Sequence, residues 1–196
     1  MDNLVSPFLN RNNEQKYTVN TLIEEIALGK RFDYVFFWRT DKNTVSTGCF
    51  SQWQESKFIA DAYQYSCAEQ YMMGQKALLF NDKEIFDEIL SAVHPREIKS
   101  LGRKVKNFDA KIWDKAKYAI VLNGNFYKFT QNKEMMRLLV STEHKVLVEA
   151  SPVDTIWGVG LAKDDKKIND PNHWKGENLL GFALMEVREE IKKLNV

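Results

Sequence analysis

The spacing of apolar residues changes at Ser66, and this change limits the folds that the chain can adopt. Before Ser66, aromatic and β-branched residues come in short runs such as Tyr34 to Trp38, a pattern typical of strands. After it, apolar residues recur with a helical period over long stretches. With 196 residues and 44% hydrophobic content, the chain can form one compact domain with a sizeable core. We predict a single α+β domain that is mostly α-helical, with a small N-terminal β-sheet.

Capping residues and turns set the expected boundaries of the elements. Strands are expected over 34–38, 44–53, 57–65 and 145–149. Helices are expected over 22–28 (Thr21 as N-cap, Gly29 as its end), 66–79, 82–92, 95–105, 109–127, 133–141 and from 176 onward. The last helix carries one apolar stripe, formed by Leu180, Ala183, Leu184, Val187 and Ile191. Residues 1–20 are polar without an apolar period and predict a loosely ordered arm.

Charge and cysteine usage argue against several classes of protein. There are 28 basic and 27 acidic residues, so no overall field attracts nucleic acid or an anionic membrane. A local group of lysines (Lys163, Lys166, Lys167, Lys175) could contact a phosphate backbone, but a solvated loop is the favoured explanation. Two cysteines and three scattered histidines show no metal-ligand spacing, which predicts neither a metal nor a cofactor. Without a leader or an apolar span, we expect a cytoplasmic protein with no membrane partner.

The loop after 145–149 combines residues that suit the wall of a pocket. Asp154, Trp157, Gly158 and Gly160 lie close together in the sequence, ahead of the final helix. Trp157 could instead be a buried anchor, and Asp154 could only shape a turn. The start of the final helix offers free backbone donors to an anion, although Asn178 is equally explained as a local cap.

Charged residues in the helical part are further candidates. Glu69 and Lys76 lie seven residues apart, on one helix face about 10 Å from each other. The alternative is that Glu69 forms a capping box with Ser66 and that Lys76 is solvated. Arg103 and Lys128 are candidates for phosphate contacts, with solvated surface charges as the alternative.

An ordered series of motifs resembles the NADAR, or YbiA-like, domain family. The resemblance runs from about Tyr34 to Ile191, and its motifs are Phe50-Ser51-Gln52-Trp53, Ala68-Glu69-Gln70-Tyr71, Gln75-Lys76-Ala77, Leu101-Gly102-Arg103, Lys128-Phe129-Thr130-Gln131-Asn132, Ser151-Pro152-Val153-Asp154, Trp157-Gly158-Val159-Gly160, Gly176-Glu177-Asn178-Leu179-Leu180-Gly181 and Leu184-Met185-Glu186-Val187-Arg188. The family usually has Ser-Asn-Phe or Ser-Asn-Tyr where this chain has Ser51-Gln52-Trp53. The match predicts a NADAR domain over 31–196 and an N-terminal extension over 1–30.

The resemblance implies cleavage of an N-glycosidic bond at a ribose carbon. The substrates known in the family are phosphoribosylamino-pyrimidines of early riboflavin synthesis and ADP-ribose on guanine, in nucleotides or in nucleic acid. Positive charge develops at the ribose C1 and the leaving nitrogen needs a proton, so a carboxylate and a proton donor are expected. Glu69 suits the first role and Asp154 suits either.

Under the same resemblance, Lys76 is the candidate nucleophile of an alternative route through a Schiff base. Substrate contacts are then expected from Ser51, Gln52, Trp53, Arg103, Lys128, Trp157, Gly158 and Asn178. Trp157 would stack on the base or sugar, Asn178 would orient hydroxyls, and Arg103 and Lys128 would hold phosphate. The rival hypothesis is a non-catalytic module that binds ADP-ribose or a related nucleotide, motivated by the altered Ser51-Gln52-Trp53 segment.

Overall fold

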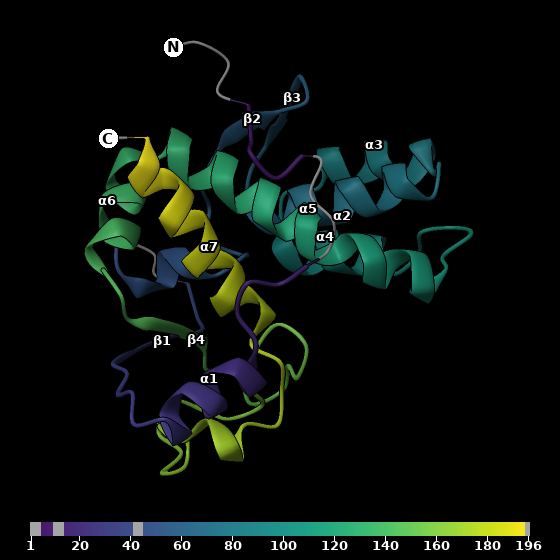
Figure 1. Cartoon of the computed structure of the whole chain (residues 1–196). Helices are drawn as coiled ribbons and strands as arrows, with labels where there is room; N and C mark the ends of the chain where they lie inside the picture. Colours follow the sequence, from purple (N-terminus) through teal and green to yellow (C-terminus); the bar gives the residue numbers. More distant parts are fainter. Residues whose placement is uncertain (1–4, 10–13, 41–44, 195–196) are drawn as a thin grey trace. The chain divides into compact units, whose positions relative to one another are not determined.

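The computed structural model describes residues 5–9, 14–40 and 45–194, and these form two compact units. The four-helix unit contains residues 52–133 and the described residues before 15. The parallel-strand unit contains 15–51 and 134–194. Helices hold far more residues than strands in the part of the chain that is described, so the predicted α+β class is confirmed (Figure 1). The predicted helical segments all contain helices.

The four-helix unit is built around α2 (Ala68–Leu79), which contacts α3 (Lys83–Ser91), α4 (Pro95–Gly102) and α5 (Ala110–Gln131). Most residues of α2 are buried, as expected for a helix with neighbours on several sides. A Cβ on Gly124 of α5 would lie 2.6 Å from the ring of Tyr71 on α2. Gly124 therefore lets the two helices approach closely.

A hairpin precedes α2 where a single strand over 57–65 was expected. Strands β2 (Phe58–Ala60) and β3 (Tyr63–Tyr65) pair antiparallel, with Phe58 opposite Tyr65. The chain reverses at Asp61 and Ala62, which both have positive φ angles of 51° and 66°. A two-residue turn of this kind matches the twist of a hairpin. The segment predicted as one strand therefore forms two.

The parallel-strand unit contains α1 (Val19–Ala27), β1 (Tyr34–Phe37), α6 (Lys133–Ser141), β4 (Val146–Glu149) and α7 (Leu179–Lys193). β1 pairs in parallel with β4, with Tyr34 opposite Val146. Two short 3₁₀ helices, η1 (Thr47–Phe50) and η2 (Pro171–His173), belong to the same unit. β1 and β4 were both predicted as strands, but their pairing was not.

The strand expected over 44–53 was wrong in its described part, because η1 occupies its centre. The Ser46 hydroxyl accepts a hydrogen bond from the Gly48 amide at 3.3 Å, which caps this short helix. Residue 44 lies outside the described residues. A side-chain cap of this kind competes with strand pairing for the same backbone groups.

Several helix ends also differ from the prediction. α1 begins at Val19, because Thr18 and Thr21 form the capping box. The expected capping box of α2 is wrong: Cys67 is the N-cap, and the Ser66 hydroxyl bonds to the Gln70 side chain at 3.0 Å instead. α4 ends at Gly102 rather than near residue 105, and α7 begins at Leu179 rather than at residue 176. The boundaries of α3 and α6, the Asp109 cap of α5 and the buried stripe of α7 agree with the prediction.

The described parts of the expected arm are ordered. Phe8 is buried and meets the ring of Phe126 edge to face at 6.1 Å, within the four-helix unit. Residues 1–4 and 10–13 of the arm lie outside the described residues. None of the described helices combines the length and apolar character that a membrane crossing requires.

Candidate active site

Glu69 is a buried carboxylate at the start of α2, with only 3% of its surface exposed. Its backbone amide donates to the Gln52 carbonyl oxygen at 2.9 Å, which ties the preceding segment to the first turn. The amides at a helix N-terminus carry partial positive charge and favour a carboxylate there. The helix thus places a negative charge in a buried position that it partly stabilises.

The side chain of Gln52 is paired with Asn125 on α5. Asn125 Nδ2 donates to Gln52 Oε1 at 3.0 Å and to the Val121 carbonyl at 2.9 Å. Gln52 Nε2 and Asn125 Oδ1 are buried and have no hydrogen-bond partner among the described residues. One polar atom of each amide is therefore available inside the unit, close to the first turn of α2.

Lys128 lies almost one turn beyond Asn125 on α5 and is fully buried, at 0% exposure. The alternative interpretation of Lys128 as a solvated surface charge is therefore wrong. Burial raises the pKa of the neighbouring Cys67 thiol, the charge of Glu69 also raises it and the charge of Lys128 lowers it. An acidic and a basic group thus both act on the thiol of Cys67, the residue at the N-cap position of α2.

Lys76, near the other end of α2, is held by aromatic rings and a carbonyl. Its Nζ donates to the Gly102 carbonyl oxygen at 2.7 Å and lies 4.2 Å from the ring centre of Phe108 and 5.6 Å from that of Trp113. Burial lowers the pKa of this ammonium group. Lys76 is therefore not the fully solvated lysine of the alternative interpretation.

Two other predicted residues of the four-helix unit are exposed. Arg103 follows Gly102 at the end of α4, next to the carbonyl that binds Lys76. The Lys99 ammonium group lies over the ring of Trp53, at 5.9 Å from the ring centre. Both side chains are therefore accessible from solvent.

In the parallel-strand unit, Asp154 shapes the loop that contains Trp157. Its Oδ1 accepts hydrogen bonds from the amides of Ile156 at 2.9 Å and Trp157 at 2.8 Å. A Cβ on Gly158 would lie 2.8 Å from the Glu149 carbonyl, so the loop packs tightly on the end of β4. Trp157 is half-buried at this fixed position.

Asn178 and Ser51 also hold backbone in this unit. Asn178 has a positive φ of 53° and is fully buried. Its Oδ1 accepts from the Glu149 amide at 3.0 Å, and its Nδ2 donates to the Leu147 carbonyl at 2.9 Å. Ser51 is buried at the end of η1, where its amide donates to the Gly48 carbonyl at 3.0 Å.

A family model described as the NADAR domain matches residues 36–192. The chain belongs to this family. Both units therefore contribute to one NADAR domain, and the predicted motif series lies within the matched residues.

Relatives of this NADAR domain include proteins named as glycosidases. An N-glycosidase of Acanthamoeba polyphaga mimivirus is 47% identical over 163 residues, which cover 80% of this chain and 95% of the viral protein. Protein irg-1 of Caenorhabditis elegans is 40% identical over 65% of this chain and 61% of its own length. The solved structure of Escherichia coli YbiA has a TM-score of 0.68 and 28% identity, and the match covers 85% of this chain and 90% of YbiA. The predicted family and fold are confirmed.

Within this NADAR domain, Gln52, Glu69 and Lys128 lie around the first turn of α2. Lys76 binds the Gly102 carbonyl, and Arg103 is the next residue in the chain. Sequence reasoning missed four residues that complete these groups: Cys67, Phe108, Trp113 and Asn125. The missed signal was spacing on α5, since Asn125 and Lys128 lie three residues apart on one helix face. Among the described residues, no group of three or more His, Cys, Asp or Glu side chains is arranged to hold a metal ion.

Proposed function

We propose that this NADAR domain hydrolyses the bond between ribose C1 and nitrogen in a phosphorylated ribosyl substrate. The two candidate substrates are phosphoribosylamino-pyrimidines of the early riboflavin pathway and ADP-ribosylated guanine. The general activity rests on the relatives, since the chain covers 95% of a viral N-glycosidase and 81% of the Escherichia coli N-glycosidase YbiA. At that level the protein is a glycosidase, a hydrolase that acts on N-glycosyl bonds.

The observation that carries the proposal is the burial of Glu69 at the helix N-terminus. Breaking the C1–N bond develops positive charge on the ribose, and a carboxylate held away from bulk water stabilises that charge more strongly than an exposed one. The amides of the first turn favour a negative charge at this position. Glu69 therefore has the charge and the environment that the role beside C1 requires.

Lys128 suits the same reaction as a buried cation beside this turn. A phosphate or pyrophosphate on the ribose needs a positive partner, and a buried ammonium group is a strong one because water does not screen it. The exposed Arg103 supplies a second positive charge near Lys76. We assign both residues to phosphate recognition in this proposal.

Lys76 offers the alternative chemistry through a covalent intermediate. In that route the glycosylamine opens, the Lys76 amine adds to C1 and displaces the base nitrogen, and water then releases the sugar from the Schiff base. The amine must be neutral to attack, and its lowered pKa increases that fraction at neutral pH. Borohydride reduction during turnover should leave the sugar attached to the wild type and not to Lys76→Ala; active turnover without any adduct favours direct attack by water.

We assign Trp157 to stacking on the base or sugar, and Asp154 to a hydroxyl or to the leaving nitrogen through its Oδ2 atom. The support is that the loop packs closely on the end of β4 and that backbone amides already use Asp154 Oδ1, which leaves Oδ2 for a ligand. For Asn178, which binds the backbone of β4 with both amide atoms, the predicted hydroxyl contact stays a prediction.

The experiment incubates the purified protein with each of the two substrates and measures the released base by chromatography. Turnover of one substrate and not the other identifies the substrate class, and Glu69→Gln should abolish the measured activity. If the protein releases the base from neither substrate, the proposal is contradicted.

A non-catalytic module is the second candidate, because the side-chain oxygen of Gln52 in the altered segment is tied to Asn125. Calorimetry that shows tight ADP-ribose binding by an inactive wild type would support the module. Loss of activity in Glu69→Gln with binding and fold intact would exclude it.

A further inference from the structure

Basic side chains of the four-helix unit are concentrated in α4 and in the segment that follows it. Residues 96–115 contain seven basic and three acidic residues, whereas the whole chain is nearly balanced, with 28 basic and 27 acidic. Among the described residues, Lys106 is the one member of the seven that forms an ion pair, with Glu84 at 2.7 Å. The other six have no carboxylate partner among those residues. This part of the unit therefore has an excess of positive charge.

Three cations of the unit alternate with two exposed aromatic rings. Lys99 lies over the ring of Trp53, at 5.9 Å from its centre, and Arg103 is about one helical turn beyond Lys99. The carbonyl group that precedes Arg103 binds the Lys76 ammonium group, which lies 4.2 Å from the ring centre of Phe108. Trp53 is 37% exposed and Phe108 is 46% exposed. We call these five residues the basic–aromatic row.

The acidic residues of 96–115 do not balance this charge. Asp109 caps α5 with its side chain, and Asp114 pairs with Lys117 at 2.7 Å. The remaining acid is Glu97 on α4. One carboxylate is too few to neutralise the basic side chains that lack an ion pair.

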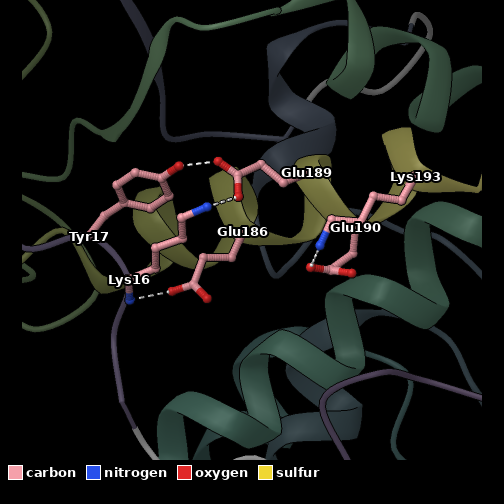
Figure 2. A network of polar contacts seen from close by, with 6 residues as sticks. All are labelled: Lys16, Tyr17, Glu186, Glu189, Glu190 and Lys193. Atoms are coloured by element: carbon pink, nitrogen blue, oxygen red, sulfur yellow. Dashed lines mark hydrogen bonds and ion pairs between the residues drawn. The ribbon is translucent and has the colours of Figure 1, made fainter.

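The charges of the row also differ from those around α7 in the parallel-strand unit. Figure 2 shows that cations there are paired, Lys16 with Glu189 and Lys193 with Glu190. In the row, burial lowers the pKa of Lys76, and no carboxylate among the described residues acts against that effect. The row is therefore a positively charged surface with aromatic rings in it, and it is free to pair with an anionic partner.

We infer that the basic–aromatic row binds a single strand of nucleic acid, with phosphates at Lys99 and Arg103 and bases against Trp53 and Phe108. Surfaces that bind single strands combine cations along the backbone with aromatic rings on which the bases stack. An acidic protein would match the cations alone, and the bases of a duplex are already stacked on each other. The exposed rings therefore favour a single strand over both.

The row begins beside the candidate active site. Trp53 directly follows Gln52, whose carbonyl oxygen accepts the Glu69 amide at 2.9 Å. Lys76 lies about two turns beyond Glu69 on α2. A strand on the row would thus present a nucleotide near the buried carboxylate. This link to ADP-ribosylated guanine in a strand rests on the proposed function, whereas binding of the strand does not.

The test measures fluorescence anisotropy of a labelled oligodeoxythymidine of about 12 nucleotides, within the site sizes of such surfaces, on addition of the full chain. The comparison probes are an abasic strand of the same length and a polyglutamate of the same charge. The strand should bind at least about tenfold more tightly than either, because stacked bases add to the affinity. Equal affinity for the abasic strand would overturn the inference, and equal or tighter binding of polyglutamate would overturn it in favour of an acidic protein. Absence of strand binding up to about 0.1 mM at physiological salt would also overturn it.

A double variant of the row, Lys99→Gln with Arg103→Gln, tests the phosphate contacts. It should weaken strand binding and make the slope of log K against log salt about 1.4 less steep, because each phosphate contact of a single strand contributes about 0.7. Lys163→Gln with Lys166→Gln is the matched control, since it removes two exposed lysines from the parallel-strand unit. Equal losses in the two double variants would show that binding follows total charge and would contradict the row.

Phe108→Leu tests the stacking contact at an exposed position, where leucine keeps an apolar side chain beside Lys76. It should weaken binding of the oligodeoxythymidine by about fivefold or more and leave binding of the abasic strand unchanged. Equal weakening of both would contradict stacking on Phe108.

The outcomes separate this inference from the proposed function. A protein that binds the strand but releases base from neither substrate supports the row and contradicts the glycosidase proposal. A protein that releases base but does not bind the strand contradicts the row alone.

Discussion

The predicted site residues of the two units use their polar side chains in different ways. In the four-helix unit, Glu69 and Lys128 are buried charges, and Gln52 and Asn125 each keep one polar atom available. In the parallel-strand unit, Asp154 and Asn178 bind backbone amides and carbonyls. Among these residues, those of the first unit are buried charged or amide groups, whereas those of the second fix the geometry of a loop. A residue's type in a motif does not reveal which of the two it serves.

The largest expected effect comes from removing the buried charge of the four-helix unit. Glu69→Gln keeps the shape and should reduce kcat by about 10²- to 10⁴-fold, the range for a charged group at the reacting centre. Base release measures the rate, and circular dichroism checks the fold. Glu88→Gln, at an exposed acid of α3, is the control and should retain full activity. A folded Glu69→Gln variant with wild-type kcat would show that catalysis does not depend on the buried carboxylate of the four-helix unit.

Two glycines, Gly181 in the parallel-strand unit and Gly102 in the four-helix unit, test how closely each unit is packed. A Cβ on Gly181 of α7 would lie 2.1 Å from the Leu147 backbone oxygen, whereas one on Gly102 would meet the Met73 sulfur at 2.0 Å. Backbone in a parallel pair cannot move aside, but a methionine side chain can. We expect Gly181→Ala to lower the free energy of unfolding by about 3 kcal/mol and Gly102→Ala by about 1 kcal/mol in urea denaturation. Similar losses at both positions would show that Met73 is as fixed as the strand.

Asn178 tests whether the parallel-strand unit supplies geometry only. Asn178→Ala removes two hydrogen bonds and leaves a β-carbon at positive φ, so it should lower the free energy of unfolding by about 2 kcal/mol. Activity per folded molecule should change much less than stability does. Asn178→Asp is the matched variant, because it keeps the Oδ1 acceptor and loses the donor to Leu147. A large drop in kcat at full stability would instead place Asn178 at the substrate.

The smallest effect concerns the charge of Lys76. Burial lowers its pKa in the folded protein, so the folded state is penalised below that lowered pKa and the penalty disappears as the pH rises to the ordinary value. The stability of wild type relative to Lys76→Met should therefore increase from neutral to alkaline pH.

Lys83 is the control of opposite sign, since the hydrogen bond to Asp87 raises its pKa. Its stabilising contribution is present at neutral pH and is lost as the pH rises through the raised value. Relative to Lys83→Met, wild type should lose stability over the same range in denaturation midpoints. If the stability of wild type relative to the two methionine variants changed with pH in the same direction, the buried environment assigned to Lys76 would be contradicted.

Local signals in the sequence located most helices but not their neighbours. Asp109 before α5 and Pro95 at the start of α4 are strong local signals, and both helices begin where those residues predict. The cap of α2 was misplaced because Ser66 bonds to a side chain, a choice between two nearby partners that sequence spacing cannot resolve. Strand pairing is a long-range property, so the partner of β1 was not predictable from its own residues.

The candidate residues show the same division. The seven-residue spacing of Glu69 and Lys76 placed both on one face of α2, because helix geometry is local. Nothing in the sequence separated the buried Lys128 from the exposed Arg103, since burial depends on which helices pack against each residue. The aromatic rings around Lys76 were also missed, because Phe108 and Trp113 lie more than thirty positions along the chain.

The sequence by itself determined the family, the helical periods and the residue types able to carry N-glycoside chemistry, because motifs and periodicity are written in neighbouring positions. Only the tertiary structure decided the parallel pairing of β1 with β4, the burial of Glu69 and Lys128, and the use of Asn178 by the backbone. Desolvation, electrostatic strength and the competition for hydrogen bonds depend on atoms brought together from distant positions, and so they are properties of the folded chain.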